Sequence, residues 1–325
     1  MTTTMKRFVF PLFERHLIWL LLALLIAIGT TVPGFISVRN FTNVLWAAAP
    51  LGCMVLGLFF VLLTAELDLS LESTFAVAPT VAVVLVTQWA GELLWPGLVI
   101  PITLAMGALI GLFNGLFTVR LGVSAFLVTL AMLLALRGVV IFLIPEGIYY
   151  LPESVTYLGS GRIGGVVPVP VVVWLALYAA AWVLINRHRL GKDIYALGNN
   201  RNAAYIAGIN IPRTKTLVFV IAGLVSAVGG ILEVGRLQSV TADMGQGDIL
   251  MVFAGAILGG TSLTGGVGRV GGIFAAVLVI AIIENLMNLY GIEPSVRQIA
   301  FGLILLAAIY LASLQGRMRL QAEAA

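Results

Sequence analysis

A small set of ionisable residues lies within or beside long apolar stretches, where charge is costly and usually indicates function or pairing. Its members are Glu66, Asp68, Glu72, Arg137 and Glu284. Carboxylates in such places contact a polar solute, carry a coupling ion or pair with a cation. No Ser-His-Asp or paired-carboxylate pattern accompanies them, and His16 and His188 are too isolated to form a metal site. These residues predict recognition or pairing inside a membrane, with no catalytic residue and no metal.

Asp68 and Ser70 stand just before an apolar run, with further hydroxyl residues one turn later. A carboxylate at a helix N-terminus is stabilised by free N–H groups and by the helix dipole. We therefore expect Asp68 to cap this helix, with direct contact to a transported solute as the alternative. Glu66 and Glu72 either line a polar pathway or face cytoplasmic water, and we favour water.

Glu284, Asn285 and Asn288 lie close together in another apolar run. Glu284 and Asn288 are spaced i, i+4, so they share one face of a helix. Amide and carboxylate groups can hydrogen-bond the hydroxyl groups of a solute. The competing interpretation is an interhelical hydrogen bond that holds the bundle together. Arg137 has an equally structural alternative, an ion pair with one of the acids.

The elements that must carry these residues are transmembrane helices. The 325 residues are 61% hydrophobic and 10% charged, with a mean hydropathy of +1.10. Soluble domains are about half apolar and about a quarter charged, which excludes a soluble enzyme, a disordered protein and a disulfide scaffold. Since a span needs about 20 apolar residues, the sequence predicts ten. They cover about 17–35, 43–65, 71–89, 93–118, 124–144, 166–186, 216–236, 249–262, 270–290 and 296–314. The eighth is too short for a full span.

The cations favour one orientation. With the N-terminus in the cytoplasm, 13 of the 18 Lys and Arg residues fall on the inner side, as the positive-inside bias requires. The outer side holds Arg39, Arg162, Arg236 and Arg297, and Arg137 lies within a span. We expect an all-α membrane protein, a polytopic bundle of about ten helices with both termini cytoplasmic. No linker divides it, so one domain is expected over residues 1–325.

Two loops are long. The outer loop, about 145–165, is rich in tyrosine and carries Glu146 and Glu153, which we expect to help dock an external partner. The inner loop, about 187–215, predicts a short helix with Asn199 or Asn200 as N-cap and Gly208 at its end. A helix this short is not stable alone in water. It either fits a cleft on a cytoplasmic partner or lies on the bilayer surface.

The apolar face of that inner helix is predicted at Ala203, Ile206 and Ala207. The stretch of chain that contains this helix resembles the cytoplasmic loop of ABC-importer permeases of the ribose, xylose, galactose and autoinducer group. It reads I-Y-A-L-G-N-N-R-N-A-A-Y-I-A-G-I-N-I-P-R-T-K. Three other places match the same family, in the same order across nearly the whole chain. They are L-D-L-S at 67–70, L-R-G at 136–138 and L-G-G-T-S-L-T-G-G at 258–266.

The resemblance implies a permease subunit of the bacterial inner membrane that translocates a sugar or polyol. It implies a second permease subunit, two cytoplasmic ATP-binding subunits and a periplasmic binding protein. ATP and magnesium belong to the ATP-binding partner, because this chain has no G-x-x-x-x-G-K-[ST] loop. The residues implied to couple to the ATPase are Asn199, Asn200, Arg201, Ala203, Ala204, Ile206, Ala207 and Gly208. The candidates for the translocation pathway are Asp68, Ser70, Glu72, Arg137, Glu284, Asn285 and Asn288.

The chain departs from the resembled family at Glu66 and Glu72, where small residues are usual, and at Glu284, where Asn is usual. An ion- or proton-coupled secondary transporter using Asp68, Glu72 or Glu284 is therefore the alternative function. A non-transporting membrane scaffold is a third hypothesis. The partner-like inner loop argues against the secondary transporter. The extra acids also leave open whether the second permease is an identical copy or a paralogue.

Overall fold

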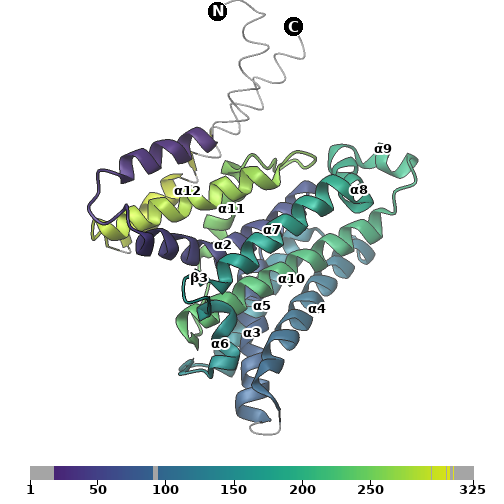
Figure 1. The fold of residues 1–325 in the computed structure, drawn as a ribbon. Helices are drawn as coiled ribbons and strands as arrows, with labels where there is room; N and C mark the ends of the chain where they lie inside the picture. The colour runs from purple at the N-terminus through teal and green to yellow at the C-terminus, as the bar shows by residue number, and fades with distance from the viewer. Residues whose placement is uncertain (1–17, 91–93, 294, 305, 308–309, 311–325) are drawn as a thin grey trace, which may run out of the picture.

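Ten apolar helices run through the described part of the computed structural model, which covers residues 18–90, 94–293, 295–304, 306–307 and 310 (Figure 1). Seven are long enough to cross a membrane. They are α2 (Val38–Leu63), α3 (Leu71–Val83) with its π-helical continuation η1 (Val84–Trp89), α4 (Val99–Arg120) after the turn η3 (Pro96–Leu98), α5 (Ala125–Leu143), α7 (Val169–Arg187), α10 (Ile211–Leu237) and α12 (Val270–Leu289). Three are shorter, namely Ile18–Gly29, α11 (Asp248–Leu258) and Ser295–Ile304. The predicted all-helical architecture and the short eighth element are confirmed, whereas the side on which each terminus lies stays a prediction.

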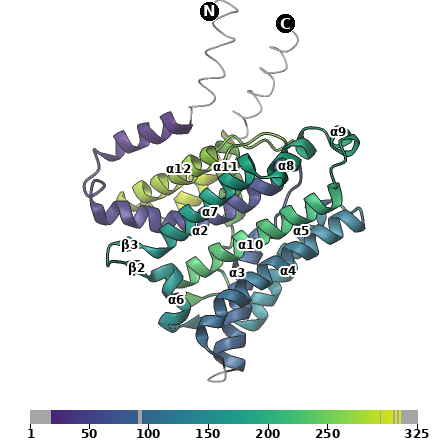
Figure 2. The same ribbon diagram turned by 45° about the vertical axis from the view of Figure 1, so that its right-hand side comes forward.

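The remaining elements gather at the two ends of the bundle. The helices α8 (Arg189–Asn199) and α9 (Arg201–Ile206) lie at one end, and α6 (Glu153–Ser160) lies at the other (Figures 1 and 2). Two small antiparallel pairs belong to the predicted outer loops. They are β1 (Ile148–Tyr149) with β4 (Ser239–Val240), and β2 (Arg162–Ile163) with β3 (Val167–Pro168). We call these the α9 end and the α6 end.

Local sequence signals set where the long helices begin. The Ser37 side chain accepts a hydrogen bond from the Asn40 backbone N–H at 3.1 Å and so caps α2. Asn210 caps α10 in the same way, accepting from the Arg213 N–H at 3.0 Å, and Pro212 occupies the first turn. The cap and the proline fix the point where the inner loop turns into the bundle.

The helix α10 runs through the middle of the bundle, where it packs against α2, α3 and α4. Gly107, Gly111 and Gly115 form one small-residue face of α4, directed at α10. A Cβ atom at Gly111 would overlap the carbonyl oxygen of Phe219, so the two backbones approach each other more closely than any larger residue permits. Such small-residue faces are the usual means of tight helix packing in membranes.

Burial divides the spans into an inner and an outer group. Most of the apolar surface of α2 and α3 is buried within the chain, whereas α5 leaves most of its apolar surface exposed. Residues such as Leu134, Ile141 and Phe142 on α5 are more than half exposed. The described residues of this chain therefore leave the face of α5 open to lipid or to another subunit.

Candidate functional site

The chain between α2 and α3 is non-helical although it lies inside the bundle. The Asp68 carboxylate accepts hydrogen bonds from the Ser70 backbone N–H at 2.9 Å and from the Ser70 hydroxyl at 2.6 Å. The side-chain amide of Asn114, on α4, donates to the Ser70 hydroxyl at 2.8 Å. All three side chains are buried. Asp68 therefore accepts a hydrogen bond from a backbone N–H group that has no partner within a helix. Non-helical chain is tolerated at membrane depth when its backbone groups are satisfied in this way.

Helices α5 and α10 hold the same segment from two sides. The Leu69 backbone N–H donates to the Thr129 hydroxyl of α5 at 3.1 Å. The Ser226 hydroxyl, near the middle of α10, donates to the Leu71 carbonyl at 2.7 Å. Because α3 starts beside the middle of α10, its first turn lies well inside the bundle instead of at the membrane surface.

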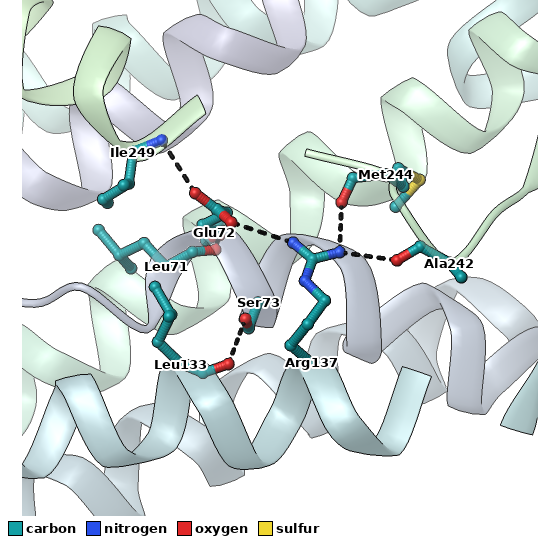
Figure 3. A network of polar contacts seen from close by, with 9 residues as sticks. Leu71, Glu72, Ser73, Leu133, Arg137, Ala242, Met244 and Ile249 are labelled. Carbon is teal, nitrogen blue, oxygen red and sulfur yellow. Dashed lines mark hydrogen bonds and ion pairs between the residues drawn. The ribbon is translucent and has the colours of Figure 1, made fainter. Parts of the chain in front are cut away.

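A buried ion pair joins α3 to α5 (Figure 3). Arg137 Nη2 lies 3.2 Å from Glu72 Oε1. Arg137 Nη1 donates to the carbonyl oxygens of Ala242 and Met244, both at 3.0 Å. The second oxygen of Glu72 accepts from the Ile249 backbone N–H at 3.2 Å. One contact thus joins the two spans to each other, and three tie them to α11 and to the segment before it.

The charges of Glu72 and Arg137 are also compensated by the backbone around them. Ile249 lies in the first turn of α11, so the Glu72 carboxylate sits at the positive end of that helix dipole. Arg137 meanwhile satisfies two carbonyl groups of the non-helical segment before α11. Two interrupted helices, α3 and α11, therefore begin close together within the bundle. Membrane transporters commonly build their solute and ion sites from discontinuous helices of this kind.

A separate polar group lies on α12. The side chains of Asn285 and Asn40 hydrogen-bond each other in both directions, at 3.0 and 2.8 Å, and so join α12 to α2. Asn288 accepts from Arg297. Glu284 is half-buried and has neither a hydrogen bond nor an ion pair among the described residues. The three predicted pathway residues of α12 therefore do not join the network around Glu72.

At the α9 end, α8 packs against the glycine-rich loop that follows α11. The Gly266 N–H donates to the Leu63 carbonyl at 3.0 Å, and the Tyr195 hydroxyl donates to the Gly268 carbonyl at 2.7 Å. A Cβ atom at Gly198 would overlap both the Leu63 carbonyl oxygen and the Gly266 nitrogen. The glycines of this loop thus allow close packing of the backbone. They are not followed by the Lys-Ser/Thr of a phosphate-binding loop.

The helix α9 projects from the same end. The Asn200 side chain accepts from the Ala203 N–H at 3.0 Å and caps the helix, and Gly208, with φ +76°, follows its end in the left-handed region. Tyr205 and Ile206 are 75% and 84% exposed, whereas Ala204 is 2% exposed. A six-residue helix thus presents two large apolar side chains to its surroundings.

One ion pair links this end to the interior. Lys215, in α10 just after the inner loop, pairs with Glu66 of the segment that leads to α3. Both side chains are largely buried, at 11% and 18% exposure. The pair therefore fixes the start of α10 to the non-helical chain between α2 and α3.

Comparison with known proteins identifies the family of this chain. Residues 40–309 match the sequence profile of a family described as "Branched-chain amino acid transport system / permease component". The chain belongs to this family of permeases. It is 34% identical to the ribose import permease protein of Escherichia coli strain K12 over 303 residues, 92% of this chain and 93% of that one. It is also 33% identical to the E. coli K12 L-arabinose transport system permease protein, covering 88% of this chain and 86% of that one.

A third relative is the galactose/methyl galactoside import permease protein of E. coli K12, 31% identical over 95% of this chain and 97% of that protein. No solved structure matches the permease significantly. The resemblance inferred from the motifs is confirmed, and the permease is a multi-pass membrane component of a transport system. The described residues hold no group of three or more metal-ligating side chains.

Several predicted positions need correction. The expectation that Glu72 faces water is wrong, because its side chain is 7% exposed and pairs with Arg137. Glu66 is ion-paired with Lys215 instead of freely solvated. Asn199 belongs to α8, where it donates to the Gly266 carbonyl at 3.3 Å, and only Asn200 caps α9. The ion pair expected for Arg137 is confirmed.

Some functional positions escaped the sequence reasoning. Asn114 and Thr129 are single polar residues inside apolar spans of the permease, and that isolation was the available signal. Asn40 carried a similar signal at the start of a span. Ser226 gave no such signal in the sequence, because the hydroxyl of a serine in a membrane helix usually bonds to the backbone of its own helix. Glu146 and Glu153, at the α6 end, are both exposed as a docking role requires, and that role stays a prediction.

Proposed function

We propose that this permease is the transmembrane subunit of an ATP-driven ABC importer in a bacterial inner membrane, and that it carries a sugar or polyol. The single observation that carries the proposal is similarity over nearly the whole chain to import permeases whose names specify ribose, L-arabinose and galactose. The family description mentions branched-chain amino acids. We favour a sugar because the full-length relatives specify sugars.

The proposed assembly contains two permease subunits, two cytoplasmic ATP-binding subunits and a periplasmic binding protein. The exposed apolar face of α5 supports a second permease, since a subunit contact there buries surface that this chain leaves open. The α9 end then faces the cytoplasm together with both termini, and the α6 end faces the binding protein. ATP and magnesium are bound by the partner, because the sequence has no phosphate-binding loop.

Within this assembly α9 is the coupling helix. The exposed side chains of Tyr205 and Ile206 enter a cleft of the ATP-binding subunit, with Ala203 and Ala207 beside them. Ala204 supports the helix from beneath, since it is buried against its own chain. Closure of the two ATP-binding subunits then moves the α9 end as a rigid body.

The polar residues divide into two roles. Asp68, Ser70, Glu72 and Arg137 use their hydrogen-bonding groups on backbone and on one another, so we assign them to holding the interrupted helices. Glu284 has the only carboxylate among the predicted pathway residues without a partner in the described chain, and it is half-buried. It is therefore the best candidate for contact with the hydroxyl groups of the solute.

Reconstitution tests the function. We expect uptake of radiolabelled ribose, arabinose or galactose into proteoliposomes only when the ATP-binding subunits, the binding protein and ATP are all present. A proton or sodium gradient alone is expected to drive none. Gradient-driven uptake that requires no ATP and disappears in Glu284→Gln contradicts the proposal and favours the secondary transporter. Absence of uptake with every partner bound favours the scaffold.

Coupling through α9 has its own test. Ala207→Glu places a charge in the predicted cleft at an exposed position that does not bear on the packing of this chain. We expect ATP hydrolysis to become independent of the binding protein and uptake to fall at least tenfold. Ala207→Ser is the matched control, because serine is small and uncharged, and it is expected to keep uptake near normal. Equal uptake in both variants removes the coupling role of α9.

A further inference from the structure

A hollow of about 540 Å³ opens at the α6 end between the start of α2 and the β2–β3 hairpin. Its polar lining comes from Arg39, Thr42, Asn43 and Trp46 of α2 and from Arg162 of β2. No Asp or Glu residue lines it. Both arginines are exposed, so their charged groups are accessible to a partner at this end of the permease.

The two arginines differ from the other cations on the predicted outer side in having no hydrogen-bond or ion-pair partner among the described residues. Arg236 pairs with Glu233, and Arg297 donates to Asn288. Neither Arg39 nor Arg162 forms an ion pair or a side-chain hydrogen bond within the described part of the chain. The positive-inside bias makes cations rare on the predicted outer side. Two arginines that line one hollow there are therefore an exception to that bias.

Trp46 holds one of these guanidinium groups in place. The indole Nε1 of Trp46 donates to the Gly159 carbonyl at 2.6 Å, which fixes the ring. The Arg162 guanidinium carbon lies 5.7 Å from the centre of that ring, a cation–π distance. Stacking on a fixed ring orients the guanidinium without using its N–H groups. Those donors stay free for an incoming ligand.

We propose that this hollow, defined by Arg39, Trp46 and Arg162, receives acidic side chains from the surface of the periplasmic binding protein. This inference rests on the proposed function and names the contact that the α6 end makes. A guanidinium fork matches a carboxylate in two parallel hydrogen bonds, so a pair of arginines suits a pair of Asp or Glu residues.

A protein partner suits this site better than a lipid headgroup. Arg162 belongs to a hairpin outside the candidate spans, and the hairpin forms one wall of the hollow. The hollow is also wide enough for more than one side chain.

The test uses the complete complex of permease and ATP-binding subunits in nanodiscs of phosphatidylcholine alone, together with the binding protein encoded beside the permease gene. The dissociation constant is measured for wild type, Arg39→Gln, Arg162→Gln and the double variant. We expect each single change to weaken binding about threefold to fivefold and the double change more than tenfold. Raising the salt concentration should weaken wild type but not the double variant.

Arg187→Gln is the matched control, because Arg187 lies over the Trp182 ring at 6.0 Å but belongs to the α9 end. It is expected to leave the dissociation constant unchanged. Unchanged binding in the double variant overturns the docking proposal while leaving the proposed function intact. An effect that appears only in nanodiscs containing anionic lipid overturns it in favour of a lipid site. A wild-type complex that neither binds nor responds to the binding protein refutes the proposed function, and the docking site with it.

Discussion

Neutralising Glu72 tests whether the buried ion pair holds the interrupted helices together. The side chains of Glu72 and Arg137 are 7% and 12% exposed, and Arg137 also serves two backbone carbonyls. In Glu72→Gln the shape is kept, but Arg137 loses its counter-charge in a place that water does not reach. Leaving one partner of a buried pair uncompensated costs about 3–5 kcal/mol. We expect a loss near the lower end of this range, because glutamine still accepts one hydrogen bond.

The loss is measured as the free energy of unfolding of the purified permease, by denaturant titration in mixed micelles with tryptophan fluorescence as the signal. Asp193→Asn is the control, since Asp193 and Arg189 form a 4.0 Å pair in which Arg189 is 85% exposed. Exposed pairs of this kind contribute less than about 1 kcal/mol. Glu72→Gln combined with Arg137→Gln should cost less than the sum of the single changes. If Glu72→Gln is no more harmful than Asp193→Asn, the ion pair does not hold these helices.

Two further changes test packing at the two ends. Gly198→Ala forces a methyl group onto the Leu63 carbonyl, so we expect lower thermal stability and reduced uptake. Gly271→Ala, where a methyl group meets open space, should be neutral in the same assays, and equal behaviour of the two variants contradicts the packing role. Asn285→Leu removes both hydrogen bonds between the two side chains, leaves Asn40 only its bond to the Phe35 carbonyl, and should cost about 1 kcal/mol in unfolding. Replacing both asparagines by leucine should recover most of that loss, and failure to recover argues for a role beyond packing.

The all-helical, apolar character of the chain followed from the sequence because hydropathy is a local property, whereas only seven of the ten predicted spans are long enough to cross a membrane. A run of about 20 apolar residues is a span wherever it packs, and the shortness of α11 was visible in its length alone. The cap of α9 was equally local, since Asn200 was one of the two residues predicted for it. The depth at which α3 begins was not local, because it depends on Ser226 and Asn114 from other helices.

The polar contacts show the same limit. Arg137 was expected to pair with an acid, but four acids were candidates, and only the packing of α3 against α5 selects Glu72. The position of Ala204 could not be read from spacing, since either side of a short helix can face its own chain. Glu284 illustrates the converse case. It shares a helix face with Asn288, yet within the described residues it forms no hydrogen bond or ion pair with the network around Glu72.

The contacts at the α9 end connect α8 and the start of α10, which flank the proposed coupling helix α9, to the interrupted helices. Lys215 pairs with Glu66 on the segment that leads into α3, and Gly198 packs against the loop that follows α11. The starts of α3 and α11 are in turn joined through Glu72. Displacement of α8 and α9 therefore acts on both interrupted helices together, because each is held at its non-helical end. The extended segments beside them absorb the change in backbone angles, since their hydrogen bonds come from side chains and not from a helical ladder. We expect solute release to follow from a shift of α3 and α11 as one unit.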